Sequence, residues 1–227
     1  NTFRGNSIAL AGHGLAGEVE AINRAGAAIS KKAASGRALV FASIGPTGKM
    51  LMMGELSAGE VRESFRQQAH ALAEGGADAL LIETMADVDE ARLALEAAKT
   101  TGLPVIVSFV FDTGKNKDRT MMGSTPEQAA KAMEEAGADA VGANCGLGIT
   151  AYIPLCARLK AATSLPVWIK PNAGLPELVD GVPVYRTTPE EFASSVPDLL
   201  SAGAGFVGGC CGTSPDFIRA IAARLAK

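Results

Sequence analysis

Gly-Ala-Asp-Ala-Val-Gly-Ala-Asn-Cys-Gly, residues 137–146, leads from the end of a helix into an apolar strand that finishes on a cysteine. Its opening recurs as Gly76-Ala77-Asp78 and Gly203-Ala204-Gly205, at spacings of about sixty residues, the length of two strand–helix units in an α/β barrel. Each copy precedes an apolar run that ends on a glutamate or a cysteine. The pattern predicts parallel strands covered by helices, with functional side chains at the carboxyl ends of the strands.

Strands and helices are predicted to alternate along the chain. Six runs carry apolar residues on both faces, as strands of a parallel sheet covered by helices must: 38–44, 79–83, 105–109, 140–145, 167–170 and 205–210. Helices are predicted at 15–34, 58–74, 88–100, 126–136, 152–162, 189–201 and 215–226. In Thr187-Thr188-Pro189-Glu190 a hydroxyl residue precedes a proline and an acidic residue, which is typical of a helix start.

This order predicts an α/β fold, a (β/α)8 TIM barrel in a single domain over residues 1–227. Asn1-Thr2-Phe3 resembles the tail of a further strand. Six strands cannot close an eight-stranded barrel, so we expect the first strand and most of the second to lie outside this sequence. An open doubly wound sheet is the alternative, but no glycine-rich dinucleotide fingerprint follows a strand.

The composition narrows the possible partners and location. The chain has 227 residues, 48% of them hydrophobic, and a net charge of −3 without a basic stripe. We therefore expect no nucleic-acid partner and no membrane partner. No apolar run is long enough for a transmembrane helix, and the start lacks a secretory signal pattern. Four cysteines without such a signal favour a reducing, cytoplasmic location and a metal-binding or catalytic use of thiols.

Three cysteines predict a metal site. Cys145 ends one strand, and Cys210 and Cys211 end another within Gly-Gly-Cys-Cys-Gly-Thr (208–213). Consecutive strand residues point to opposite faces, so both members of the pair reach one metal only where the strand breaks, and the surrounding glycines permit that break. Three thiolates with a fourth position left open are typical of a catalytic zinc site. Without the cysteine pair, Cys145 would be interpreted as a small buried hydrophobic residue. Cys156 is predicted to have that core role.

Other strand ends carry polar candidates. Glu83 follows three apolar residues and is interpreted as the acceptor for a substrate ammonium group, with a structural salt bridge as the alternative. Asn172 is either a hydrogen-bonding site residue or a turn former before glycine. Ser43 opens Ser-Ile-Gly-Pro-Thr (43–47), which can present backbone N–H groups to a carboxylate or simply form a turn. Asp112–Arg119 is a polar stretch that contacts a donor or partner, or is a solvated loop.

Several of these phrases together resemble one family. Asn-Cys-Gly (144–146), Pro-Asn-Ala-Gly-Leu-Pro (171–176) and Gly-Gly-Cys-Cys-Gly-Thr (208–213) are similar to those of homocysteine S-methyltransferases. The group includes the homocysteine domain of cobalamin-dependent methionine synthase and betaine–homocysteine methyltransferase. Ser-Ile-Gly-Pro-Thr (43–47) and Leu-Ile-Glu-Thr (81–84) fit the same pattern in the same order.

The resemblance implies a zinc-dependent barrel enzyme that moves a methyl group to the thiol of homocysteine and yields methionine. Cys145, Cys210 and Cys211 would bind Zn²⁺. Glu83 would hold the amino group of homocysteine, Asn172 would lie near the metal, and Thr2 and Ser43 would join the substrate site.

The family's methyl donors differ in kind. Betaine, S-methylmethionine and a methyl-corrinoid are all used within it. The last of these would be carried by another protein or domain, because this chain contains no cobalamin-binding module.

Two alternatives remain open from the sequence. Lys170 at a strand end is also compatible with a barrel aldolase or lyase that forms a Schiff base. A zinc-holding docking domain without catalysis is the other alternative.

Overall fold

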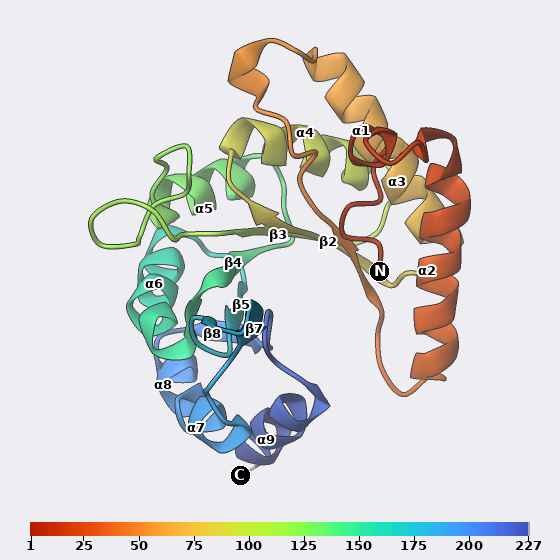
Figure 1. Cartoon of the computed structure of the whole chain (residues 1–227). Coiled ribbons are helices and arrows are strands. Elements are labelled where there is room, and N and C mark those ends of the chain that lie inside the picture. Colours follow the sequence, from red (N-terminus) through yellow and green to blue (C-terminus); the bar gives the residue numbers. More distant parts are fainter. Residues whose placement is uncertain (227) are drawn as a thin grey trace. The chain divides into compact units, whose positions relative to one another are not determined.

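The computed structural model describes residues 1–226, and strands alternate with helices along them (Figure 1). The residues form two compact units. The first holds residues 1–107 and 135–139, and the second holds residues 108–134 and those from 140 onwards. The boundary crosses β3 (Val105–Phe109) after Val107, so this strand belongs in part to each unit. None of the helices in the described part of the chain is both long and apolar enough to cross a membrane.

The first unit contains parallel strands and a group of helices that pack against one another. Its strands lie in the order β1-β2-β3, and β1 pairs with β2 in parallel from Phe41 opposite Ala79 to Ile44 opposite Ile82. Helix α3 packs against both α2 and α4. The other elements of this unit are α1 (Ser7–Ala11), η1 (Ala16–Glu18), α2 (Val19–Ala34), β1 (Phe41–Ile44), η2 (Leu51–Met53), α3 (Ala58–Glu74), β2 (Ala79–Met85) and α4 (Val88–Lys99).

Local chemistry explains where these elements begin. The Ser57 side chain accepts a hydrogen bond from the Glu60 amide while Glu60 bonds back to Ser57, so α3 starts with a capping box. The buried Glu90 carboxylate of α4 accepts hydrogen bonds from the Thr47 amide (2.7 Å) and hydroxyl (2.6 Å). Glu90 thereby fixes the loop that follows β1, and burial raises the pKa of its carboxyl group.

Two expectations for this unit are wrong in detail. Residues 1–3 form no strand, because the Gly5 amide bonds back to the Thr2 carbonyl and closes a turn. The strand expected at 38–44 is shorter, and along β1 buried residues alternate with half-buried ones. Strand β1 is thus half-buried on one face. Strand β3 is buried at every residue, as expected for a parallel strand covered on both faces.

The second unit continues the parallel arrangement. Its strands lie in the order β3-β4-β5-β8, with Val141 opposite Val167 and Ile169 opposite Val207. The rings of Phe192 and Phe217 meet edge to face at 5.5 Å in the core. The other elements are α5 (Pro126–Glu135), β4 (Ala140–Gly148), α6 (Ile149–Ala162), β5 (Val167–Asn172), β6 (Glu177–Val179), β7 (Val182–Val184), α7 (Pro189–Ser194), α8 (Val196–Ser201), β8 (Ala204–Val207) and α9 (Pro215–Leu225).

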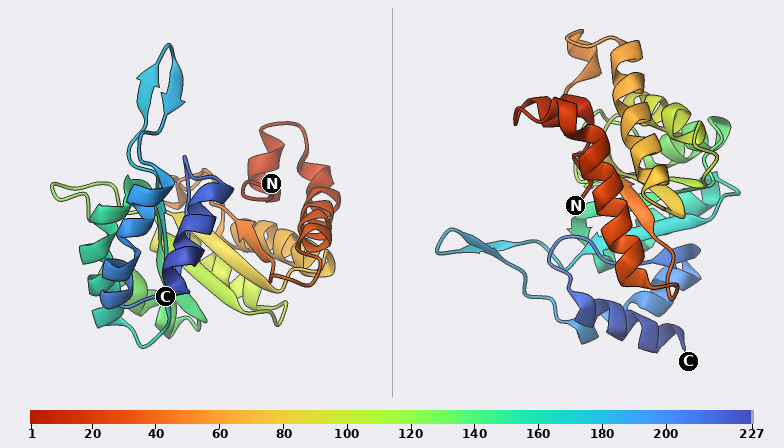
Figure 2. Two further views of the ribbon diagram at one scale, coloured as in Figure 1. Left: turned by 90° about the horizontal axis from the view of Figure 1, so that it is seen from below. Right: turned by 90° about the vertical axis from the view of Figure 1, so that its right-hand side faces the viewer.

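Three features of this unit depart from the predicted elements. Strand β8 ends at Val207, before the cysteine pair rather than at Cys210. The helix expected at 189–201 is divided at Ser195 into α7 and α8, because Pro197 has no N–H to continue the ladder. Strands β6 and β7 form an antiparallel hairpin that the sequence did not predict, and it projects from its unit as the light-blue arm in Figure 2.

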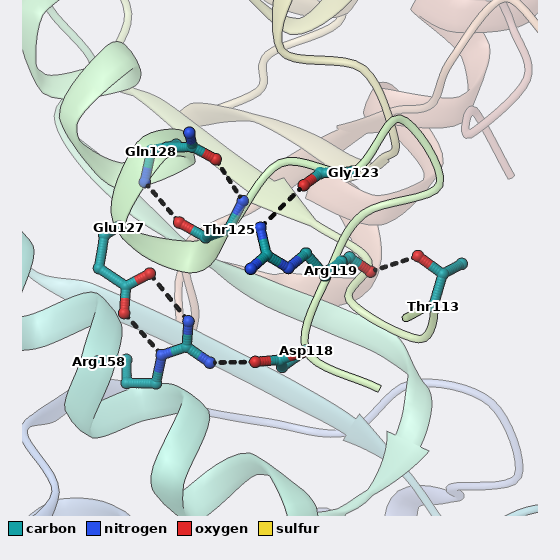
Figure 3. Close-up of polar contacts among 8 residues, drawn as sticks. All are labelled: Thr113, Asp118, Arg119, Gly123, Thr125, Glu127, Gln128 and Arg158. Carbon is teal, nitrogen blue, oxygen red and sulfur yellow. Dashed lines mark hydrogen bonds and ion pairs between the residues drawn. The ribbon is translucent and has the colours of Figure 1, made fainter. Parts of the chain in front are cut away.

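Hydrogen bonds from one arginine hold the loop between β3 and α5 in place. Arg158 of α6 donates two hydrogen bonds to the Glu127 carboxylate (2.6 and 2.9 Å) and one to Asp118 (2.6 Å), as Figure 3 shows. Thr125 and Gln128 exchange hydrogen bonds at the start of α5. The loop around Asp118 is therefore attached to two helices. The hydrogen bonds from Arg158 lower the pKa of Glu127 to about 2.

We expect Glu127→Gln to destabilise the protein at neutral pH by about 1 kcal/mol, since the pair is bidentate but partly exposed. A carboxylate whose folded pKa is depressed contributes stability above its unfolded pKa and loses it as pH falls towards the folded value. The difference from wild type should therefore shrink between pH 4.5 and about 2. Urea unfolding across this pH range measures it.

Glu190→Gln is the matched control, because Glu190 is an exposed carboxylate in the first turn of another helix. A Glu127→Gln deficit that is independent of pH would contradict the role given to Arg158.

Candidate metal centre

Three sulfur atoms of the second unit lie close together. The Sγ atoms of Cys145, Cys210 and Cys211 are all within 4.8 Å of one another, and those of Cys145 and Cys211 are 3.7 Å apart. Among the described residues this is the one group of three or more histidine, cysteine or acidic side chains arranged to share a metal ion. All three cysteines are free thiols, with Cys211 the most exposed of them. The structure thus brings together the three residues that the sequence predicted as metal ligands.

Backbone hydrogen bonds hold the cysteine pair beside β5. The amide of Gly208 donates to the Ile169 carbonyl (2.9 Å), and the amide of Cys210 donates to the Pro171 carbonyl (2.8 Å). The Ala173 amide in turn donates to the Cys211 carbonyl (2.9 Å). Residues 208–211 therefore follow the end of β5 after β8 has ended, which frees the two cysteine side chains from strict alternation.

Cys145 reaches the cluster through an unusual backbone conformation. Its φ is +66°, in the left-handed region that few residues other than glycine adopt. The hydroxyl of the buried Tyr152, in α6, donates a hydrogen bond to the Cys145 carbonyl. This bond from outside the strand holds a conformation that costs about 1–3 kcal/mol when unsupported.

A chain of side-chain contacts continues behind the sulfurs. The Ser108 hydroxyl donates to Asn144 Oδ1 at 2.7 Å, and Asn144 Nδ2 lies 3.8 Å from the Cys210 sulfur. Asn144 and Ser108 are both fully buried. Asn172, which is also buried, accepts a hydrogen bond from the Cys211 amide at 3.1 Å. The predicted site residue Asn172 therefore touches the backbone of the cysteine pair.

Without a metal ion, the three thiols of this cluster differ in pKa. The hydrogen bond from Cys210 lowers the pKa of Cys145, and the same contact, with burial, raises the pKa of Cys210. Burial also raises the pKa of Cys211. Cys145 is therefore the thiol that ionises first among the three. Cys156 lies apart and fully buried, and burial raises its pKa to about 11, which fits the core role predicted for it.

The other predicted substrate residues meet in the first unit. The Thr2 hydroxyl donates to the Ser43 carbonyl (2.8 Å), and the Ser43 hydroxyl donates to a Glu83 carboxylate oxygen (2.5 Å). Glu83 is 9% exposed, at the end of β2, and the next residue, Thr84, has a φ of +62°. The structure thus joins Thr2, Ser43 and Glu83 in one hydrogen-bonded series.

Sequence reasoning missed several residues that surround the cysteines. Tyr152 lies in helix α6, and Tyr185 directly follows strand β7. No sequence motif marked either residue. Ser108 and Asn144 sit inside apolar strands, and only the position of Asn144 next to Cys145 was a signal. Lys170 lies half-buried on β5, and a cation there favours the thiolate form of Cys210. Its Schiff-base role stays a prediction.

The sequence matches known proteins over its whole length. A family model described as homocysteine S-methyltransferase matches residues 1–225. A methionine synthase from Mycobacterium leprae is 31% identical and one from Mycobacterium tuberculosis is 30% identical, each over 100% of this chain. The chain spans about a fifth of the length of these two relatives, 20% of each.

Solved structures of the homocysteine methyltransferase MmuM from Escherichia coli share the fold. Its metallated form superimposes with a TM-score of 0.80 at 23% identity, covering 98% of this chain and 77% of that one. Its oxidized form gives a TM-score of 0.79 at 22% identity, with the same coverage. The α/β architecture is thus that of a TIM barrel, of which this chain covers a part.

We expect thiol labelling of chelator-treated protein to separate the cysteines by their pKa values. Labelling of Cys145 should reach half its maximal rate at a lower pH than labelling of Cys211, because the pKa of Cys145 is lowered and that of Cys211 is raised. Cys156 should react only near pH 11, or after unfolding, because burial favours its neutral form. Peptide mass spectrometry at a series of pH values reads both rates. A Cys145 midpoint at or above that of Cys211 would contradict the proton arrangement described above.

Proposed function

The chain belongs to the homocysteine S-methyltransferase family, and from this premise we propose that it transfers a methyl group to the thiol of homocysteine and produces methionine. We propose further that a zinc ion held by Cys145, Cys210 and Cys211 activates that thiol. The name methionine synthase, carried by two relatives, supports the product, and the sulfur cluster supports the metal.

The spacing of the sulfurs is the observation that carries the proposal. Zinc–sulfur bonds of about 2.3 Å in tetrahedral geometry place two ligand sulfurs about 3.8 Å apart. Cys145 and Cys211 stand 3.7 Å apart without a disulfide. A soft, all-thiolate donor set of this kind suits Zn²⁺ and is a poor match for Mg²⁺ or Ca²⁺. Three protein ligands also leave a fourth tetrahedral position for a substrate sulfur, as in catalytic rather than structural sites.

Zinc in such a site supplies a cation that favours the thiolate form of a substrate thiol at neutral pH, where a free thiol is mostly protonated. The three cysteines bind as thiolates, so together they carry one negative charge more than the ion neutralises. The substrate sulfur accordingly stays rich in electrons for attack on a methyl group. Tyr152 and the hydrogen bonds along β5 hold the ligand sulfurs in place and add no charge.

Glu83 is the proposed acceptor for the ammonium group of homocysteine. The Ser43 hydroxyl occupies one carboxylate oxygen and orients the group, and Thr2 fixes the backbone of Ser43 in turn. The ammonium group of the substrate would form a charge-assisted hydrogen bond with this carboxylate. We assign Thr2 and Ser43 to positioning Glu83, and Asn172 to positioning Cys211.

The methyl donor belongs to one of three classes: betaine, S-methylmethionine, or a methyl-corrinoid carried by another protein or domain. Incubation with homocysteine and each methyl-labelled donor in turn, followed by detection of labelled methionine, distinguishes the three donor classes.

The proposed metal site requires reduced thiols, which suits a reducing compartment such as the cytoplasm.

Calorimetry tests substrate activation directly, independently of the donor. We expect the zinc-loaded protein to bind homocysteine with release of about one proton at pH 7, because the thiol ionises on binding. Homoserine, which has a hydroxyl group in place of the thiol, is the matched ligand and should release none. Titrations in buffers of different ionisation enthalpy measure the proton count.

Two variants complete this experiment. Cys211→Ala should lose both stoichiometric zinc and proton release, whereas Cys156→Ala should keep both, because Cys156 lies outside the cluster. A Cys211→Ala protein that retains one zinc and the proton release would overturn the proposed site.

A further inference from the structure

Two polar side chains lie inside otherwise apolar strands behind the sulfur cluster. Ser108 stands between Val107 and Phe109 in β3, and Asn144 directly precedes Cys145 in β4. Ser108 and Asn144 are both 0% exposed. A buried hydroxyl or amide group costs free energy unless it is hydrogen-bonded, so the partners of these two side chains indicate why strands of this kind carry them.

The two side chains are hydrogen-bonded in series, and the series ends on a sulfur. The side-chain amide of Asn144 has one acceptor atom, Oδ1, and two donor hydrogens on Nδ2. Oδ1 accepts a hydrogen bond from the Ser108 hydroxyl group at 2.7 Å. Nδ2 faces the Cys210 sulfur and donates to it at 3.8 Å. The hydroxyl group of Ser108 therefore favours the orientation in which the nitrogen of the amide meets the cluster.

The opposite orientation of the amide would be unfavourable next to a metal-bound thiolate. Rotation of the amide by half a turn exchanges its oxygen and its nitrogen. Oδ1 would then face Cys210, and a thiolate has no proton to donate to it. In the observed orientation a donor faces the sulfur instead, and a hydrogen bond to an ionised acceptor is about twice as strong as a neutral one. Cys210 is half-buried, so water alone solvates its sulfur incompletely.

We propose that Ser108 and Asn144 are positioning residues of the metal centre: Ser108 fixes the orientation of the Asn144 amide, and Asn144 stabilises Cys210 as a thiolate ligand through its hydrogen bond. The inference rests on the proposed function. Asn144 Nδ2 takes up part of the negative charge of the Cys210 sulfur and holds that sulfur within 4.8 Å of the other two. Outer hydrogen bonds of this kind change metal affinity by about 10–100-fold.

Nuclear magnetic resonance of the cadmium-loaded chain tests the hydrogen bond itself. Cd²⁺ is a soft ion suited to thiolate ligands, and the experiment uses a cadmium isotope that has a nuclear spin. We expect scalar coupling between the metal and a side-chain amide proton of Asn144, transmitted through the Cys210 sulfur. An amide with a purely structural role would show no such coupling. Protein that holds one cadmium ion per chain but lacks this coupling would overturn the proposal.

Ser108→Ala tests the orienting role. Because this variant lacks the hydroxyl group that holds Oδ1, we expect the coupling between metal and amide to be lost. We also expect zinc to bind about tenfold more weakly in competition with a chelator. Unchanged coupling and unchanged zinc affinity would contradict the role of Ser108.

Ser64→Ala is the matched control. Ser64 is also a buried serine hydrogen-bonded to another side chain, Ser7 (2.7 Å), but it lies in the first unit, away from the cysteines. This variant should bind zinc as the wild type does. Equal weakening of zinc binding in both variants would mean a general loss of stability and would also overturn the proposal.

A further measurement uses metal-free protein, so its result stands even if the chain binds no metal and the proposed function fails. Nuclear Overhauser effects should connect the side-chain amide protons of Asn144 with the β protons of Cys210, because Nδ2 lies beside that sulfur. These effects should weaken in Ser108→Ala, in which the amide is free to rotate, and persist in Ser64→Ala. Wild-type protein without these effects, or equal effects in the wild type and Ser108→Ala, would exclude the arrangement on which the inference depends.

Discussion

The backbone hydrogen bonds between residues 208–211 and the end of β5 are the constraint on which the sulfur cluster depends. Strand β8 stops at Val207, yet the chain stays in step with β5 through the amides of Gly208 and Cys210 and the carbonyl of Cys211. These bonds fix the position of two neighbouring cysteines without the alternation of a strand. Removal of the hydrogen bonds would leave two thiols on a glycine-rich turn with many conformations, and the entropy of ordering them would oppose metal binding.

The third sulfur arrives by a different route, at a local cost in strain. Cys145 adopts a left-handed backbone, and Tyr152 and the Ser108–Asn144 pair support the residues around it. The cluster thus combines one strained residue and two residues on an ordered turn. Strain of this kind persists only where the surroundings over-determine it, which is a common property of functional sites. The hydrogen bond between Cys145 and Cys210 lowers the pKa of the first thiol and, together with burial, raises that of the second.

Periodicity predicted most of the fold because the helices and strands bury continuous apolar faces. The bounds of α3 and β3 agree with the expected ranges, and the repeated glycine-alanine openings correctly marked where strands begin. The hairpin of β6 and β7 escaped prediction because its apolar residues are exposed, so they follow no burial pattern. The break at Ser195 was missed although Pro197 signals it, since a proline near a helix start is also a normal feature.

Among the site residues, those that are chemically conspicuous could be predicted and those that support them could not. Adjacent cysteines between glycines stand out in any sequence. The hydroxyl group of Tyr152 and the amide of Asn144 act through three-dimensional contacts that no spacing reveals. The grouping of Thr2, Ser43 and Glu83 came from resemblance, and their hydrogen bonds became evident only in the structure.

X-ray absorption at the zinc edge, with and without homocysteine, tests the central claim most directly. The account predicts one zinc per chain, coordinated by three sulfurs from Cys145, Cys210 and Cys211. The sulfur count should rise to four when homocysteine is added, because its thiol fills the open position. A shell with fewer than three sulfurs, or one that does not change with homocysteine, would contradict the assignment of this cluster as the site of thiol activation.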